Sequence, residues 1–391
     1  MIACVIALTT LLASISAAAE PQFAAPAAPK PEAATATAPA PEMSAPGGPA
    51  PGMPATGMPA PGMPATRYER TEQREPCADY RPLRQPLFGD LHVHTSLSFD
   101  SYISSQRNTP ADAYRYARGE AITLPDADAN QVIKARIQRP LDFTAVTDHA
   151  EFLGPIRLCT SPDSGMARWF PGCIATRSEL FPVQFLAADY WQGLGVSGDE
   201  EVKEQSMVCS LGDCEAAHRE AWQQIQDAAE EHYDRSADCQ FTTFIGYEYT
   251  DAPNFANLHR NVIFRNERVT DIAISTYDTG SRNVPELWRR LRSECIDGDQ
   301  GCDVLAIPHN PNLSAGLMFP DPASEEEARA RLFFEPLVEL VQHKAVSECR
   351  FDRLLGRGVA TEDELCDFEQ APADNLSMLG TVYGEMRAET G

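Results

Sequence analysis

Basic residues are scarce in this chain. Its 391 residues include 32 Lys and Arg against 57 Asp and Glu, which gives a formal net charge of −25. Proteins that coat nucleic acid need clustered basic side chains against the phosphates, so we exclude that class. The charge balance does not exclude a small anionic substrate that metal ions hold. Hydrophobic residues make up 43% of the chain, which excludes a wholly disordered protein.

Long apolar runs are missing after residue 19. Spanning a bilayer takes about 18–20 consecutive apolar residues, and only residues 1–19 come close. This segment has no charged side chain and ends in three alanines before Glu20, which predicts a cleaved signal peptide. A membrane anchor is the alternative. We therefore expect an exported protein, periplasmic or secreted, with no transmembrane span after signal removal.

Residues 20–66 have the composition of a linker. They contain 13 of the 31 prolines, and a five-residue repeat begins at Gly52 (GMPAT, GMPAP, GMPAT). Such a segment cannot bury a core and is expected to be disordered, extended and partly polyproline II. Residues 67–391 are then the predicted globular domain.

The cysteines fit an oxidising compartment. Removing Cys4 with the signal leaves ten, an even number that suits disulfides in an exported protein. Close spacing suggests the pairs Cys209–Cys214, Cys295–Cys302, Cys349–Cys366 and Cys159–Cys173, which leaves Cys77 with Cys239. Ten cysteines allow hundreds of connectivities, so spacing alone does not choose among them. A thiolate metal site is the alternative, but the chain has no Cys-x-x-Cys.

Short apolar runs alternate with helical patterns in the predicted domain. The predicted strands are Leu87–Thr95, Asp142–Thr147, Gln240–Tyr249, Asn261–Arg265, Val304–Pro308 and Leu337–Gln342. The predicted helices are Pro110–Glu120, Cys214–Tyr233, Pro285–Ile296 and Ser324–Phe334. This alternation favours a mainly parallel α/β fold, either a barrel or an open sheet. Residues 155–210, which hold Gly, Pro, Trp and three cysteines, are predicted to form an irregular insertion.

The strongest chemical signal is the segment FGDLHVHT at residues 88–95. Alternate side chains of a strand share a face, so Asp90, His92 and His94 are predicted to point the same way. Two imidazoles and a carboxylate are ligands that suit zinc, manganese or iron. Asp100 follows just past the strand as a further candidate ligand. The alternative is a polar strand face with hydrogen-bonded histidines.

Other residues that can bind metal lie at boundaries of the predicted strands. They are Asp148, His149, Glu248, His259, His309 and His343. Folds of the α/β class place their sites at strand ends, and a carboxylate such as Glu248 can bridge two cations. The remaining two histidines, His218 and His232, lie in a predicted polar helix and are expected to be exposed. Together these positions predict a multinuclear metal site.

Five segments jointly resemble a known superfamily. They are GDLHVHTSLSFD, TAVTDHAEFLG, IGYEYT, NLHRNVIF and IPHNPN. Over about residues 85–391 the chain resembles the PHP (polymerase and histidinol phosphatase) superfamily of metal-dependent phosphoesterases, and most of all its exported branch, DUF3604. The resemblance implies a distorted (β/α)7 barrel with two or three divalent metal ions at the carboxyl ends of the strands.

The resemblance also implies a role for each motif residue. It matches His92 and His94 to the first ligand pair, Asp100 to the acidic position after that pair, His149 with its neighbour Asp148 to the second motif, Glu248 to the bridging carboxylate, and His259 and His309 to the later histidine ligands. Superfamily members close the site with a final Asp-x-His. No Asp-x-His follows His343 here, so we expect an incomplete barrel and a site that lacks two ligands.

These ligands suggest a hydrolytic mechanism. Two cations bridged by Glu248 would activate a water for attack on a phosphoester. His149 or His309 would protonate the leaving group, while Arg260 and Lys344 would contact the anionic substrate.

Three functions remain open on the sequence. They are phosphoester hydrolysis, hydrolysis of another ester or an amide, and an inactive metal-binding or adhesion module on a linker. The insertion at 155–210 is expected to be a disulfide-pinned lid or a surface decoration. We make no prediction of the oligomeric state.

Overall fold

The computed structural model describes residues 74–358, except for Pro82, 125–131, 198–205, 254–255, 299–300, Ala315, 343–344, 348–350 and 353–356. All described residues belong to the second of the two units into which the chain divides, Thr66–Gly391. The predicted signal peptide and linker lie outside the described residues. So do His343, Lys344 and the predicted disulfide between Cys349 and Cys366.

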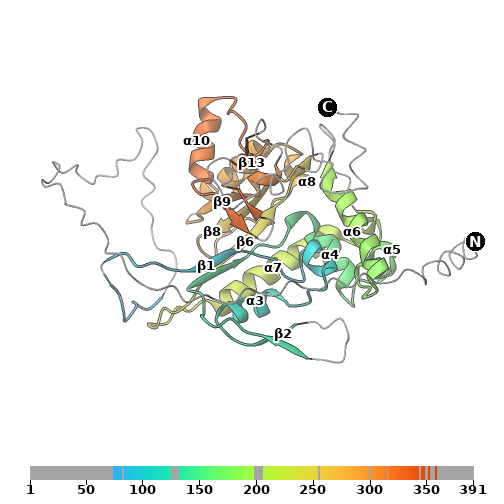
Figure 1. The fold of residues 1–391 in the computed structure, drawn as a ribbon, viewed down its shortest axis with the longest axis horizontal. Helices are drawn as coiled ribbons and strands as arrows, with labels where there is room; N and C mark the ends of the chain where they lie inside the picture. Colours follow the sequence, from blue (N-terminus) through green and yellow to red (C-terminus); the bar gives the residue numbers. More distant parts are fainter. Residues whose placement is uncertain are drawn as a thin grey trace, which may run out of the picture. The chain divides into compact units, whose positions relative to one another are not determined.

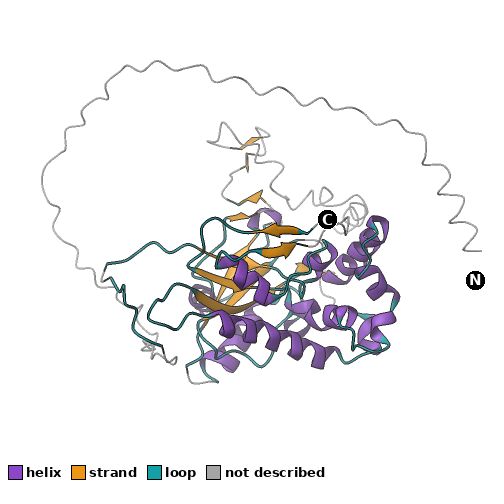
Figure 2. Cartoon of the chain, turned by 90° about the horizontal axis from the view of Figure 1, so that it is seen from below, coloured by secondary structure: helices purple, strands orange, loops and turns teal. Residues whose placement is uncertain are grey.

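A five-stranded sheet organises the domain, in the order β1-β4-β6-β8-β9. The strands are β1 (Gly89–Val93), β4 (Phe143–Val146), β6 (Thr242–Tyr249), β8 (His259–Phe264) and β9 (Val304–His309). They curl into half a barrel, and within the described part of the chain the two edge strands do not meet (Figure 2). The class is therefore mixed α/β.

The sheet is mixed rather than mainly parallel. Strands β1, β4 and β6 run parallel, but β8 runs antiparallel to both β6 and β9. A parallel crossover needs a dozen or more residues, usually with a helix. Residues 250–258, which connect β6 to β8, are shorter than that, so the chain turns back directly. The expectation of a mainly parallel sheet is therefore wrong for β8.

Nine helices are found among the described residues, and the four predicted from sequence are confirmed. Those four are α3 (Pro110–Ala117), α7 (Cys214–His232), α9 (Val284–Leu291) and α10 (Glu325–Phe334). The others are α2 (Phe99–Ile103), α4 (Leu153–Thr160), α5 (Pro171–Thr176), α6 (Phe181–Gly195) and α8 (Thr276–Thr279). Helix α3 begins where Thr109 and Asp112 form a capping box, and Asp213 caps α7. No helix in the described residues has the length and apolarity to cross a membrane.

Short strand pairs complete the described structure. They are β2 (Ile122–Leu124) with β3 (Ile133–Ala135), β5 (Val196–Ser197) with β7 (Ala252–Pro253), β10 (Val341–Gln342) with β11 (Ala345–Val346), and β12 (Phe351–Asp352) with β13 (Arg357–Gly358). Of the predicted strand Leu337–Gln342, only β10 is a strand in the structure. Before it, the backbone N–H of Glu339 donates to the carbonyl of Pro308 at 2.9 Å, which holds this segment against the end of β9.

The main core lies between the sheet and helices α3, α7 and α9. Figure 1 shows α3 and α7 beside the sheet, which they contact at β4 and β6. Trp222 of α7 packs edge-on against Tyr247 of β6, with ring centroids 5.6 Å apart. The hydroxyl of Tyr114 on α3 donates to the carbonyl of Phe244 and accepts the backbone N–H of Val146, which fixes α3 across β4 and β6. Burial of these aromatic side chains stabilises the fold.

Two histidines of α7 differ from expectation. His232 is buried and stacks on Tyr114, and its Nδ1 lies 2.9 Å from the carbonyl oxygen of Ala228. His218 is partly buried. The long polar pattern of α7 predicted exposed histidines, but both side chains lie on the flank of the helix that packs inward.

Within residues 155–210, the described residues are largely helical, where we expected an irregular insertion. Helices α4, α5 and α6 and a 3₁₀ turn at Met207–Ser210 build a second apolar cluster around Trp191. The indole N–H of Trp191 donates to Thr176 Oγ1 at 2.8 Å. Pro171 occupies the first turn of α5, where a missing N–H costs nothing, so this proline starts a helix rather than interrupting one. The cluster packs on Phe99 and Ile103 of α2.

Four of the five predicted disulfides are confirmed. They join Cys77 to Cys239, Cys159 to Cys173, Cys209 to Cys214, and Cys295 to Cys302. The fifth lies outside the described residues. Cys77–Cys239 spans 162 residues and fastens the first described segment to the loop before β6, whereas Cys209–Cys214 spans only 5.

Loop length predicts unequal costs for removing these disulfides. A cross-link stabilises mainly by restricting the unfolded chain, and more so for a longer loop. We expect Cys77→Ala with Cys239→Ala to lower the free energy of unfolding by about 5 kcal/mol, against about 2 kcal/mol for Cys209→Ala with Cys214→Ala. Urea unfolding of the two double variants measures this difference. Equal losses would contradict the loop-length explanation.

Candidate metal centre

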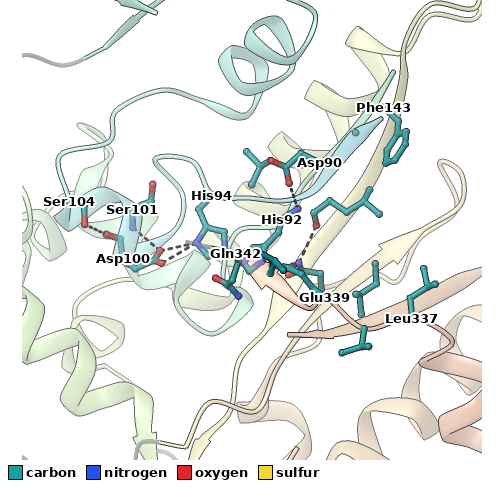
Figure 3. Close-up of a pocket in the computed structure, with 17 residues that line it drawn as sticks. Asp90, His92, His94, Asp100, Ser101, Ser104, Phe143, Leu337, Glu339 and Gln342 are labelled. Carbon is teal, nitrogen blue, oxygen red and sulfur yellow. Dashed lines mark hydrogen bonds and ion pairs between the residues drawn. The ribbon is translucent and has the colours of Figure 1, made fainter. Parts of the chain in front are cut away.

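Strand β1 presents three predicted residues to one cavity. Asp90, His92 and His94 all line it (Figure 3). Gly89, Leu91 and Val93 line it as well, so this cavity does not test the alternation predicted for the strand. The carboxylate of Asp90 accepts the backbone N–H of its own neighbour His92 at 3.0 Å. Among the described residues, Asp90 belongs to no group of side chains close enough to share a metal ion. His92 and His94 do belong to such groups.

Glu248 is the centre of the site. Its side chain is 0% exposed, and five imidazoles surround it. Oε2 lies 3.2 Å from His92 Nε2 and 2.7 Å from His94 Nε2. Oε1 lies 2.6 Å from His259 Nδ1, 3.2 Å from His309 Nε2 and 3.4 Å from His149 Nδ1. One carboxylate accepts about four hydrogen bonds, so five imidazoles exceed what hydrogen bonding alone requires.

The sheet topology explains why these histidines meet. Glu248 is near the carboxyl end of β6, and His149 forms an isolated bridge with it from the end of β4. His259 begins β8 and pairs directly with His309, which ends β9. Because β8 is antiparallel to both neighbours, its first residue lies beside the last residues of β6 and β9. All five imidazoles therefore meet at one edge of the half-barrel.

Asp100 forms a second group on α2. Its carboxylate lies 3.1 Å from His94 Nδ1 and 3.4 Å from His149 Nε2. It also accepts hydrogen bonds from the hydroxyl of Ser98 and the backbone N–H of Ser101, both at 2.7 Å. These bonds fix the orientation of the carboxylate toward the two histidines.

Glu339 is a site residue that the sequence reasoning missed. Its Oε2 lies 2.9 Å from His92 Nδ1, and it forms a group with His92 and His309. The available signal was a single acid within the apolar run LVELV at 337–341. An acid there is costly to bury unless it has a partner.

Four overlapping groups could each hold a metal ion, with candidate ligand atoms within 4.8 Å of one another. They are His92 with His309 and Glu339; His92 with His94 and Glu248; His94 with Asp100 and His149; and His149 with Glu248 and His259. This mixed imidazole and carboxylate set suits zinc, manganese or iron. His309 Nδ1 is also buried with no hydrogen-bond partner in the described structure. The residues present therefore fit a metal centre.

Asp148 is close to the groups but belongs to none of them. It is fully buried, and its carboxylate accepts the backbone N–H of Thr95 at 2.5 Å and its hydroxyl at 2.7 Å. Burial raises the pKa of Asp148 to about 6, although the hydrogen bonds from Thr95 oppose this. Asp148 thus ties the end of β1 to the end of β4, while the next residue, His149, faces the groups.

Arg260 does not belong to the four metal-binding groups. The Arg260 side chain is 3% exposed and pairs with the buried carboxylate of Glu335, which also accepts the indole N–H of Trp288 at 3.1 Å. Alternation along β8 places His259 on one face and Arg260 on the other. The expected contact between Arg260 and an anionic substrate therefore lacks support. His343 and Lys344 lie outside the described residues.

Burial and neighbouring charges shift the pKa values of several residues at the site. Burial alone raises the pKa of Glu248, but His149, His309 and His94 outweigh burial and hold that pKa well below its usual range. Burial lowers the pKa of His92, but Glu248 and Glu339 outweigh it and raise that pKa to about 9. For His309, burial wins over Glu248 and lowers the pKa to about 4.

A family model covers the whole of this site. Residues 81–388 match the family described as "Protein of unknown function (DUF3604)". The chain belongs to DUF3604. Searches of curated proteins and of solved structures returned no match. Every residue of the four groups lies inside the part of the chain that matches DUF3604.

The pKa of His92 predicts that metal binding depends on pH. At pH 7 this imidazole is protonated in the metal-free protein, and a metal ligand must be neutral. Raising the pH through about 9 removes the competing proton, so affinity for Mn²⁺ is expected to rise between pH 7 and 9. Calorimetry at pH 7 in buffers of different ionisation enthalpy would detect the released protons. An affinity that is flat over this range would refute the competition.

Arg260 is predicted to act in stability and not in metal binding. Arg260→Ala leaves Glu335 buried without its ion-pair partner, which is expected to cost about 3–5 kcal/mol of unfolding free energy. Arg265→Ala is the matched control, because Arg265 is exposed on the same chain segment and is expected to change stability by about 0.5 kcal/mol or less. Denaturation curves and elemental analysis test both variants. Loss of metal with unchanged stability would place Arg260 at the site after all.

Proposed function

We propose that this DUF3604 protein is an exported metal-dependent hydrolase of phosphoesters. The observation that carries the proposal is Glu248, a fully buried carboxylate with five imidazoles around it. Sites that only stabilise a fold need one ion and four ligands. Here the described groups share members and offer space for two or three divalent ions, which is the arrangement used for water activation.

We also propose that the fold is a PHP-type barrel. The half-barrel sheet, with its candidate ligands gathered at strand ends, supports a PHP-type (β/α)7 barrel. Four disulfides support folding in an oxidising compartment, in keeping with the predicted signal peptide.

We assign each residue of the site a role in the proposed hydrolysis. Bound divalent ions would supply a Lewis acid and lower the pKa of a water ligand. Glu248, His92, His94, His149, His259, His309, Asp100 and Glu339 would hold the ions. His309 is neutral at pH 7 because burial lowers its pKa to about 4, so it suits a ligand and not a proton donor. His149 belongs to two of the groups, and it would protonate the leaving group only if the ions leave one of its ring nitrogens free; its Nδ1 lies against the hydroxyl of Thr250.

Metal content and turnover of Glu248→Gln test the proposal. The amide keeps the size of the side chain but removes the negative charge that lies beside all five histidines. We expect at least half of the metal to be lost and aryl phosphate hydrolysis to fall on the order of 100-fold. Glu327→Gln on α10 is the matched control and is expected to change neither.

The same assay separates the alternatives. Turnover of carboxylic or sulfate esters without turnover of phosphate esters would replace the phosphoesterase proposal with another metallohydrolase. Retained metal without any turnover would favour an inactive metal-binding module. Absence of metal in the wild-type protein, after zinc, manganese and iron have each been offered, would overturn the metal centre itself.

A further inference from the structure

A cavity of about 860 Å³ adjoins the metal-binding groups. His92, His94, Asp100 and Glu339 line part of it (Figure 3). Its volume falls in the range of small-molecule sites, about 300–1,000 Å³. Any substrate that reacts at the four groups would therefore place its remaining atoms in this cavity.

One part of the cavity is apolar. The lining there comprises Leu91, Phe143, Ile307, Leu337, Val338 and Val341. Figure 3 shows Phe143 and Leu337 on one side of His92, and Asp100, Ser101 and Ser104 on the other. Leu337 is 53% exposed and Val341 is 60% exposed, an uncommon grouping of exposed aliphatic side chains beside a polar site.

The apolar wall is built into the strands. Phe143 lies beside Gly89 in the β1–β4 register, and a Cβ at Gly89 would fall 2.3 Å from the Phe143 ring. Only glycine leaves room for the ring in that place. The Phe143 ring is thus fixed by the sheet.

The cavity is lined by acidic side chains and by apolar ones. Among its described lining residues there is no Lys or Arg, whereas Asp90, Asp100 and Glu339 are acids. A second anionic group on the leaving group would lie against the six apolar side chains, which offer an anion neither a hydrogen bond nor an opposite charge. Moving a charged group out of water against such side chains is costly enough to change affinity by about tenfold.

We propose that the cavity selects phosphomonoesters whose leaving group is apolar and has no negative charge. This inference rests on the proposed function and adds the substrate class to it. The phosphate would lie at the four groups, and an aryl or alkyl leaving group would lie against Phe143 and Leu337. Nucleoside diphosphates and triphosphates, sugar bisphosphates and phosphorylated carboxylic acids would be poor substrates, because their leaving groups bring a second negative charge.

Binding of two phosphonates to the metal-loaded full chain tests the inference without turnover. Benzylphosphonate has an apolar group in place of the leaving group, and phosphonoacetate has a carboxylate there. We expect benzylphosphonate to bind at least tenfold more tightly by calorimetry. The corresponding kcat/KM ratio, for benzyl phosphate over phosphoglycolate, is expected to favour the benzyl ester by a similar factor.

Leu337→Arg tests the role of the wall. The change removes an apolar contact and adds a cation, so the affinity ratio should fall by about tenfold or invert. Leu332→Arg is the matched control, because Leu332 is a 66% exposed leucine on α10 that does not line the cavity. Both variants should keep the wild-type metal content.

The outcomes separate the two proposals. Equal binding of both phosphonates, or a ratio that Leu337→Arg leaves unchanged, would overturn the substrate class and leave phosphoester hydrolysis standing. Tighter binding of phosphonoacetate to the wild-type protein would also overturn it. If neither phosphonate binds and neither ester is hydrolysed, the phosphoesterase proposal fails and the substrate class fails with it.

Discussion

The burial of the Glu248 carboxylate is the constraint on which the rest of the structure depends. A charge taken out of water is costly unless charged or polar groups surround it. Here the compensation comes from imidazoles on β1, β8 and β9 and at the end of β4. Each of these strands must end or begin at the same level of the sheet. The contacts of this carboxylate therefore link strands β1, β4, β6, β8 and β9 at one end of the half-barrel.

The mixed direction of the strands follows from the same requirement. His259 is the first residue of β8, and in a parallel strand it would lie at the opposite edge of the sheet from Glu248. Running β8 backwards brings it to the edge where β6 and β9 end. The motif segments could be predicted from the sequence because each is local. The direction of β8 could not, because the sequence pattern does not show that the short connection from β6 reverses the chain.

Adjacent residues near the site face different ways. His149 and Asp148 are adjacent, as are His259 and Arg260, yet only the histidine of each pair faces the groups. Arg260 turns instead to Glu335, which is far away in the sequence. Glu339 reaches His92 across the end of β9, a contact that the sequence does not signal. Contacts between residues that are far apart in the sequence, such as these two pairs, could therefore not be predicted from the sequence.

The Cys77–Cys239 bond has a mechanical consequence. Cys239 precedes β6 at its amino end, and Thr242 and Glu248 are about 20 Å apart along that strand. Tension applied through the chain before Cys77 would pass into the domain at this covalent clamp. The load would then enter at the loop between α7 and β6 and would not peel β1, which carries His92 and His94, away from β4. A protein held by its amino-terminal segment could be pulled without disturbing its ligands.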